Sequence, residues 1–186
     1  SAQTSTYQDQ VQKMYVAYYG RPGDPGGLNW WAGKLELAGG DLSEIIDNFG
    51  SSQEYVDRFG SMSNADLVNN IFIQLFGRDA DAAGRDWYVG KLESGDAEWS
   101  LASIALRVAD GVPEGSDDAS VVLNRMSVAN AYTDAVEQGL QPYTGINDIN
   151  AAVDLLAGVD SDLSSRDLAI NTLPANTFDF YVMNLA

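Results

Sequence analysis

The chain has 186 residues, of which 45% are hydrophobic and 20% charged, and its formal net charge is −17. It contains no histidine and no cysteine, which excludes Ser-His-Asp and Cys-His catalysis and leaves carboxylate chemistry and oxygen-ligated cations such as calcium. A surface of this charge repels phosphate backbones, so nucleic acid is not expected as a partner. No apolar stretch reaches the roughly 18 residues of a transmembrane helix, so no membrane insertion is expected.

The first two elements in chain order are helices joined by a tight turn. Apolar residues between Tyr7 and Tyr19 recur at spacings of three and four, which predicts a helix over about 7–19. Gly20 stands where this helix ends, because glycine adopts the left-handed conformation without strain. Asp24-Pro25 provides an N-cap followed by a good first helical residue, which predicts a second helix over about 24–38.

Two short helices and a second unit follow. The capping-box pattern Asp41-Leu42-Ser43-Glu44 opens a helix that ends at Gly50, and the next helix runs from about Ser51 to Gly60. The second unit begins at the cap Ser63, continues through a helix over 81–93, and ends with a helix over about 100–108.

The two units share a sequence motif. Gly20–Leu35 recurs as Gly77–Leu92, with Gly, Arg, Asp, Gly, Trp and a final Gly-Lys-Leu at matching positions. Every matched position lies 57 residues after its counterpart. A repeat of this length is a supersecondary unit that buries its faces against a neighbour.

The C-terminal part follows a loop over 112–118 that contains Pro113 and Gly115. Helices are predicted over about 119–137, 146–157 and 165–173, and the aromatic tail 176–186 is left unassigned. Because no strand-like alternation of useful length occurs, we expect an all-α fold with two helix-turn-helix repeats and a C-terminal helical segment in a single compact domain. The expected divisions are 8–58, 65–111 and 117–175.

The repeated side chains are interpreted as structural. Trp30 and Trp87 occupy equivalent positions, and a residue kept in both halves of a repeat is typically kept for packing, so both indoles are expected in the core. Arg21 and Arg78 are expected to bond to helix-end carbonyls or to a nearby carboxylate.

A few residues remain as candidates for binding. The repeat and the helical faces do not account for the aromatic residues Tyr18, Trp99 and Tyr143, which are therefore the candidates for a ligand-facing surface. The acidic linker places Asp160 and Asp162 as candidate calcium ligands, with calcium as a candidate cofactor. Asp79-x-Asp81 begins like a calcium loop but lacks the later ligands, so helix capping by Asp81 explains it better.

The motif resembles a known family. Tyr15-x3-Tyr19-Gly20-Arg21-x2-Asp24-x2-Gly27-x2-Trp30, followed by Phe49-x2-Ser52-x-Glu54-Tyr55, resembles the DUF4214 family. The second copy matches through Gly77-Arg78-x2-Asp81-x2-Gly84-x2-Trp87 but lacks Ser-x-Glu-Tyr after its third helix. The segment Leu123-Asn124-Arg125-x2-Val128-Ala129-x2-Tyr132-Thr133 is similar to the region that commonly follows, which extends the resemblance to roughly residues 8–173.

The resemblance implies an exported bacterial protein. DUF4214 repeats occur in exported proteins, often beside calcium-binding RTX repeats, and the layout also resembles the N-terminal domain of surface-layer proteins. This implies an extracellular or cell-surface location and attachment to lipopolysaccharide with the help of calcium. Residues 1–6 carry no basic and apolar run, so no secretory signal peptide is expected there.

The expected function is therefore a non-enzymatic module that binds cell-surface polysaccharide and anchors or assembles an exported protein. The alternative is a protein–protein interaction or spacer domain of a large RTX-type adhesin, with another surface protein as its partner. A carboxylate-dependent enzyme such as a glycosidase is the third hypothesis. It would require two neighbouring carboxylates in a deep cleft.

Overall fold

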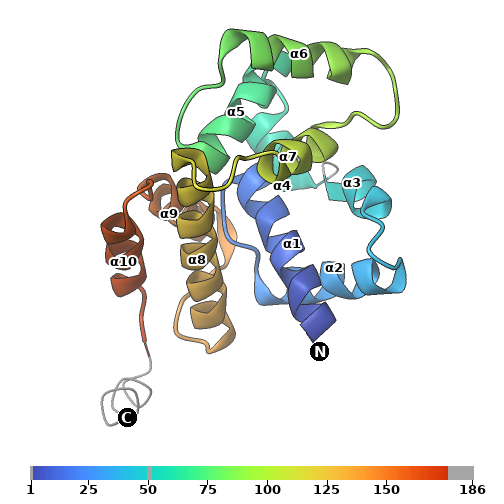
Figure 1. Cartoon of the computed structure of the whole chain (residues 1–186). Helices are drawn as coiled ribbons and strands as arrows, with labels where there is room; N and C mark the ends of the chain where they lie inside the picture. The colour runs from blue at the N-terminus through green and yellow to red at the C-terminus, as the bar shows by residue number, and fades with distance from the viewer. Residues whose placement is uncertain (1, 50–51, 176–186) are drawn as a thin grey trace.

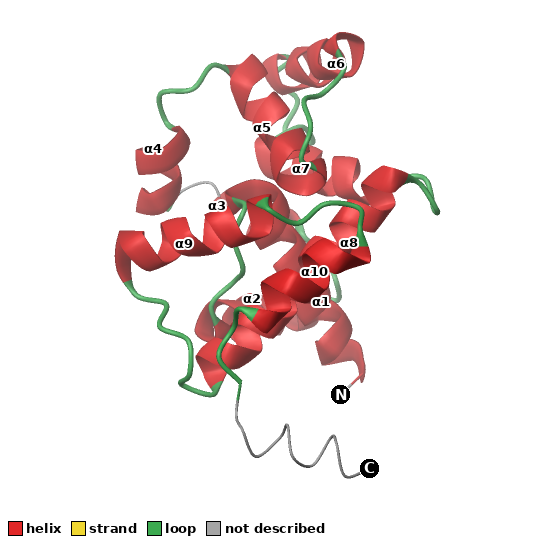
Figure 2. Ribbon diagram, turned by 90° about the vertical axis from the view of Figure 1, so that its left-hand side faces the viewer, coloured by secondary structure: helices red, strands yellow, loops and turns green. Residues whose placement is uncertain are grey.

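A computed structural model describes residues 2–49 and 52–175, and the tail 176–186 lies outside the described residues. The described part contains helices and no strands, so the expected all-α fold is confirmed (Figure 2). The helices are α1 (Ala2–Tyr19), α2 (Pro25–Leu37), α3 (Ser43–Phe49), α4 (Gln53–Phe59), α5 (Asn64–Phe76), α6 (Ala82–Glu93), α7 (Leu101–Asp110), α8 (Asp117–Glu137), α9 (Gly145–Ala157) and α10 (Leu163–Asn171).

Side-chain caps set the start of most helices. The carboxylates of Asp24 and Asp81 accept hydrogen bonds from the amides of Gly27 and Gly84, so these two residues cap α2 and α6 as the sequence predicts. The helices α4, α5, α7 and α8 begin at serine caps. At the other end of α5, Gly77 has φ +70°, a left-handed conformation that favours glycine.

The first helix lies at the centre of the molecule. It packs against α2, α5, α7 and α8 (Figure 1). All residues from Val11 to Gly20 except Lys13 are buried, so the C-terminal half of α1 is covered on every side. Spacings of three and four indicate a helix with one apolar face. In the structure, neighbouring helices cover the other faces of α1 as well.

The two copies of the repeat match in structure as well as in sequence. In the first copy α1 leads through Gly20 into α2, and in the second α5 leads through Gly77 into α6. Side chains from later in the chain bind the end of each leading helix. Arg58 donates to the carbonyl of Tyr19 at 2.8 Å, and Arg125 donates to the carbonyls of Ile73 and Gln74 at 2.9 and 2.6 Å.

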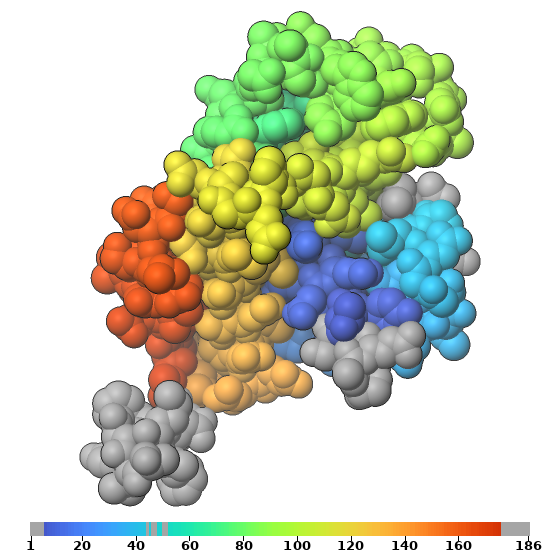
Figure 3. All heavy atoms as spheres, viewed as in Figure 1, coloured from blue at the N-terminus to red at the C-terminus, as the bar shows by residue number. Residues whose placement is uncertain are grey.

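The C-terminal helices complete the core. The long helix α8 contacts α1, α2 and α5, and its Val122 belongs to the main hydrophobic cluster of the repeats. A second, smaller cluster joins α8, α9 and α10 to Val16 of α1. Figure 3 shows the orange and red atoms of these helices beside the blue atoms of the N-terminal part. The repeats and the C-terminal segment therefore form one body.

The expected burial of both repeated tryptophans is wrong. Trp30 is 56% exposed and Trp87 is 53% exposed, although the two indoles do occupy equivalent places. In α2 the buried residues are Leu28, Ala32 and Leu35. Trp30 lies two residues from Leu28 and two from Ala32, so it projects from the other side of the helix.

Candidate functional site

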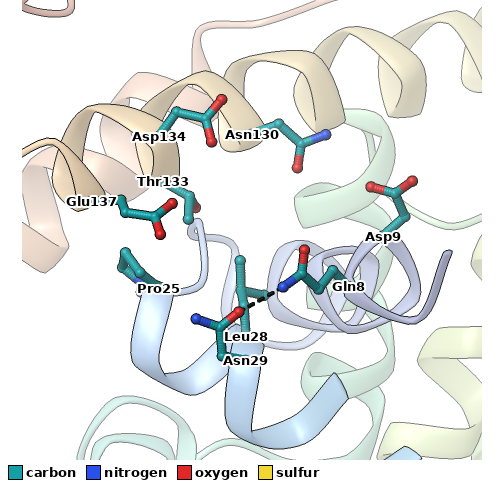
Figure 4. Close-up of a pocket in the computed structure, with 9 residues that line it drawn as sticks. All are labelled: Gln8, Asp9, Pro25, Leu28, Asn29, Asn130, Thr133, Asp134 and Glu137. Atoms are coloured by element: carbon teal, nitrogen blue, oxygen red, sulfur yellow. Dashed lines mark hydrogen bonds between the residues drawn. The ribbon is translucent and has the colours of Figure 1, made fainter. Parts of the chain in front are cut away.

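The main candidate site is a pocket where α1 and α2 face α8, with a volume of about 220 Å³. Figure 4 shows the side chains of α8 on one side of this pocket and those of α1 and α2 on the other. The lining residues are Gln8 and Asp9 from α1, Pro25, Leu28 and Asn29 from α2, and Asn130, Thr133, Asp134 and Glu137 from α8.

A buried polar network fixes the walls of the pocket. Gln12, which is 1% exposed, accepts a hydrogen bond from the Gly23 amide at 2.8 Å and donates to the Thr133 hydroxyl at 2.9 Å. Thr133 in turn donates to the Gly23 carbonyl at 2.7 Å. These bonds hold the turn before α2 against α8. Because the network is buried and each group has a partner, it fixes one relative position of the two walls.

The same turn requires glycine at position 23. A Cβ atom there would lie 2.7 Å from Leu28 and 2.8 Å from Tyr15, which is closer than real side chains approach. Asp24 then caps α2, so Pro25, the first residue of the helix, reaches the pocket. The repeat motif therefore shapes one wall of the site.

The pocket is acidic. It is lined by the carboxylates of Asp9, Asp134 and Glu137, and no lysine or arginine is among its lining residues. Partial burial, together with the neighbouring Glu137, raises the pKa of Asp134 above its ordinary value. The pocket therefore disfavours anions and offers strong hydrogen-bond acceptors.

Carboxamides complete the lining. Gln8 donates to the side-chain oxygen of Asn29 at 2.6 Å, and Gln12 donates to that of Asn130 at 3.3 Å. The oxygen of each asparagine is thereby engaged, which turns its NH₂ group toward other acceptors. The pocket thus combines acceptors and donors, a set that matches a ligand rich in hydroxyl groups.

A second polar cluster lies behind the turn and is structural. Arg21 forms a bidentate pair with Glu54 at 2.8 and 2.6 Å, and it also donates to the Pro22 carbonyl at 2.9 Å. The expected structural role of Arg21 is confirmed by these contacts. Burial opposes ionisation of Glu54, but hydrogen bonds and charge from Arg21 and Arg58 hold its pKa below the ordinary value.

The structure does not bring the three candidate aromatic residues together. The expected surface position of Tyr18 is wrong, because this residue is 6% exposed and stacks on Tyr55 with ring centroids 4.7 Å apart. Tyr143 is half-buried, and its hydroxyl donates to the Pro22 carbonyl at 2.6 Å and accepts from Arg21 at 3.1 Å. These bonds occupy the polar end of Tyr143 within the fold.

Trp99 is the candidate that stays near the surface. Its half-buried ring meets that of Trp87 edge to face, with centroids 5.5 Å apart, and the Arg107 guanidinium lies 4.1 Å from its centroid. The rings of Trp99 and the exposed Trp87 therefore form one aromatic surface.

Asp160 and Asp162 serve the turn that leads into α10. A carboxylate oxygen of Asp160 accepts from the Asp162 amide at 2.9 Å, and this hydrogen bond lowers the pKa of Asp160. Calcium takes six to eight oxygen ligands. Across the described residues, no group of three or more acidic side chains is placed to hold a metal ion. The pair does not fit a calcium site by itself.

Sequence reasoning missed the residues that build the pocket. Gln12 bonds to Asn130 and Thr133, which follow it by 118 and 121 residues. No local sequence pattern connects residues so far apart. The expected bond of Arg78 to a nearby carboxylate is confirmed, but the sequence did not identify Asp118 as its partner. Arg78 binds Asp118 bidentately at 3.0 and 2.6 Å, just after the cap Ser116, so Ser116-x-Asp118 replaces Ser52-x-Glu54.

Comparisons with known proteins give one match. Searches of curated proteins and of solved structures each returned no match. No helix within the described ranges is long and apolar enough to cross a bilayer. The family model described as "Domain of unknown function (DUF4214)" matches residues 46–103, a segment that contains the second copy of the motif, and supports assignment of this part of the chain to that family.

Proposed function

We propose that this chain is a non-enzymatic saccharide-binding module of an exported bacterial protein, and that its α1–α2–α8 pocket binds a neutral ring of a cell-surface polysaccharide. The observation that carries the proposal is the pocket lining, in which three carboxylates, three carboxamides and a threonine surround a space of about 220 Å³ without a basic side chain.

The lining selects for hydroxyl groups. Carboxylates accept short, charge-assisted hydrogen bonds from hydroxyls, and the asparagine NH₂ groups donate to ring and hydroxyl oxygens. The absence of lysine and arginine from the lining disfavours phosphate and acidic ligands. Pro25 and Leu28 alone among the lining residues are apolar, which disfavours a lipid tail.

The size of the pocket supports binding without turnover. Sites for drug-sized ligands measure roughly 300–1,000 Å³, so about 220 Å³ suits a single sugar ring. A glycosidase places two carboxyl groups on either side of the bond between two rings. In this pocket Asp9 from α1 faces Asp134 and Glu137 from α8, but a space of about 220 Å³ holds one ring and not the two rings that flank a scissile bond.

The location and the anchoring role rest on the resemblance of the motif to repeats of exported proteins. A single-ring pocket gives weak binding, with Kd between about 1 mM and 1 μM. Attachment to a polysaccharide, in which the same sugar recurs many times, makes such an affinity useful.

A glycan array of bacterial surface polysaccharides tests the proposal, read with the wild-type chain and with the double variant Asp134→Asn/Glu137→Gln. The array should show binding to neutral glycans that falls at least about tenfold in the double variant. The matched control Glu36→Gln/Asp154→Asn removes the same charge from exposed positions outside the pocket and should bind as wild type.

Whole cells separate the remaining hypotheses. Binding should disappear when the surface polysaccharide is stripped from the cells, and the glycans should release no reducing ends on incubation. Equal retention on stripped and intact cells would refute the saccharide proposal in favour of a protein partner or a spacer. Released reducing ends would refute the non-enzymatic assignment.

A further inference from the structure

The two repeats each expose one helical face built from the same three residues. In α2 these are Trp30, Gly33 and Lys34, and in α6 they are Trp87, Gly90 and Lys91. Residues three and four apart lie on the same side of a helix. We name them the Trp–Gly–Lys faces.

The indoles are exposed but held in place. Each is more than half exposed, and the following aromatic ring meets it edge to face, Trp31 at 4.6 Å in the first copy and Tyr88 at 5.0 Å in the second. The interplanar angle is 80° in both copies. A large apolar ring fixed in water in both copies has no packing reason within its own helix pair.

The glycines leave the surface beside each indole bare. A glycine in the middle of a helix is less stable than alanine. Yet a Cβ atom added at Gly33 or Gly90 would meet no described atom within 4 Å apart from its chain neighbours and the backbone of its own helix. No neighbour in the described chain therefore requires glycine at these positions. Glycine is the residue that allows another molecule to approach a backbone closely.

Among the described side chains, no carboxylate pairs with the lysine of either face. Seven basic residues form ion pairs with carboxylates. An eighth, Arg125, donates hydrogen bonds to backbone carbonyls. Within the described residues, the recorded contacts of Lys34 and Lys91 are to aromatic rings, each ammonium lying 5.2 Å from the indole centroid of its own face. In a chain of net charge −17, two such lysines at equivalent places are unusual.

We propose that each Trp–Gly–Lys face binds an acidic sugar ring. The apolar C–H side of the ring stacks on the indole over the bare glycine, and the ring carboxylate pairs with the lysine ammonium. The argument for this occupant is charge complementarity, since each face presents, beside an aromatic surface, a cation that pairs with no carboxylate of the described residues. The inference shares with the proposed function only the class of ligand, because the acidic pocket favours a neutral ring.

The face of α6 is the larger of the two. Trp99 extends its aromatic surface, and the Lys91 ammonium also lies 5.5 Å from the Trp99 centroid. The α6 face should therefore bind the acidic ring more tightly than the α2 face. The two helices lie at different ends of the molecule (Figure 1), so a long polysaccharide can engage both and gain avidity.

Nuclear magnetic resonance of the ¹⁵N-labelled full chain tests the proposal, with tetragalacturonate as the probe. The chain has four tryptophans and therefore four indole N–H signals, which single Trp→Phe variants assign. The signals of Trp30 and Trp87 should shift saturably. The methyl ester of the probe keeps the rings but removes the charge, and it should bind at least about tenfold more weakly.

Two lysine variants make the assignment specific. Lys34→Gln should abolish the shift at Trp30 alone, and Lys91→Gln the shift at Trp87 alone, whereas the control Arg166→Gln removes a distant cation and should change neither. Unmoved indole signals at tens of millimolar probe, or equal binding of the ester, would overturn the proposal. Equal binding of tetraglutamate would also overturn it, in favour of an acidic protein surface.

Gly90→Ala separates a binding role from a structural one. Because the new methyl group meets open space, the variant should melt at a higher temperature than wild type and still bind tetragalacturonate more weakly. A lower melting temperature or unchanged binding would refute the role given to the glycine. Asp134→Asn/Glu137→Gln should leave the indole shifts intact, so failure of the pocket and failure of these faces are distinguishable.

Discussion

Two arginines at equivalent places of the repeat show how burial changes the value of one ion pair. The side chains of Arg21 and Glu54 are 10% and 18% exposed, whereas those of Arg78 and Asp118 are 47% and 27% exposed. Removal of one partner from a buried pair leaves an uncompensated charge in the interior.

We therefore expect Glu54→Ala to lower the free energy of unfolding by about 3–5 kcal/mol and Asp118→Ala to lower it by about 0–1 kcal/mol. Urea denaturation of the two variants measures both values. Similar losses in the two variants would show that burial does not distinguish the pairs.

The same carboxylate makes stability depend on pH. The pKa of Glu54 is lower in the folded chain than in the unfolded chain, so its contribution is complete above the unfolded value of about 4.3 and is lost as pH falls through the folded pKa. The difference in stability between wild type and Glu54→Gln should shrink as urea denaturation is moved from neutral pH to acid. A constant difference would contradict the linkage.

The exposed tryptophans change the expected cost of their removal. Trp87 is 53% exposed and Phe72 is 8% exposed, although both are aromatic residues of the second repeat. Trp87→Ala should cost about 1 kcal/mol, and Phe72→Ala about 3–5 kcal/mol. Thermal or urea unfolding checks the contrast, and a large loss for Trp87→Ala would restore a packing role for its indole.

The position of these indoles was readable from the sequence, but the repeat obscured it. Leu28, Ala32 and Leu35 define the buried side of α2 by their spacing, and Trp30 falls outside it. The recurrence of the tryptophan in both copies suggests a packing role. In the structure, both tryptophan side chains are exposed. The pocket could not be predicted, because Gln12 meets Thr133 across 121 residues and single polar residues carry no pairing signal.

At the scale of the elements, Arg125 joins three helices. It is 3% exposed and donates to the carbonyls of Ile73, Gln74 and Val159 at 2.9, 2.6 and 2.9 Å. These carbonyls belong to the end of α5 and to the turn after α9. Burial without a carboxylate partner lowers the pKa of Arg125 to about 10.

We expect Arg125→Lys to destabilise the chain by about 2–4 kcal/mol, because one ammonium cannot reach carbonyls on both sides and each unsatisfied buried group costs about 1–3 kcal/mol. Hydrogen exchange should accelerate at the ends of α5 and α9. Arg166→Lys, at an exposed pair with its neighbour, serves as the control. Unchanged exchange in Arg125→Lys would refute this joining role.

Helix starts were predictable where a single cap decides them and less so elsewhere. Asp24 and Asp81 were identified because the cap and the following turn are local in sequence. The helix α1 begins at Ala2 and not near Tyr7. The sequence does not predict this start, because the first turn has no apolar periodicity. The acid that pairs with Arg78 was missed because the chain between α6 and Ser116 is longer than the chain between α2 and Ser52, which shifts Asp118 out of the 57-residue register.

At the scale of the whole molecule, the charge of −17 makes stability sensitive to salt. Screening should raise the melting temperature, but calcium should add little at matched ionic strength, because the described residues gather no group of three acidic side chains. A specific site would instead add about 2.7 kcal/mol at a hundredfold excess over Kd. A calcium titration by calorimetry, with magnesium as the control, distinguishes the two outcomes.

The repeats depend on the C-terminal segment for a complete core. Because α8 packs on α1 and α5, a fragment of residues 1–111 leaves both helices uncovered on that side. This fragment should lose the cooperative thermal transition of the full chain and bind a hydrophobic dye. Cooperative melting of the fragment near the temperature of the full chain would show that the repeats fold alone.

The arginines that bind the last carbonyls of α1 and α5 are synthesised well after these helices. Arg58 follows Tyr19 by 39 residues, and Arg125 follows Gln74 by 51 residues. At a synthesis rate of about 5–20 residues per second, the first of these intervals lasts about 2–8 s. During that delay α1 lacks the side chain that binds its last carbonyl, which leaves this end of the helix free to unfold locally until Arg58 has been made.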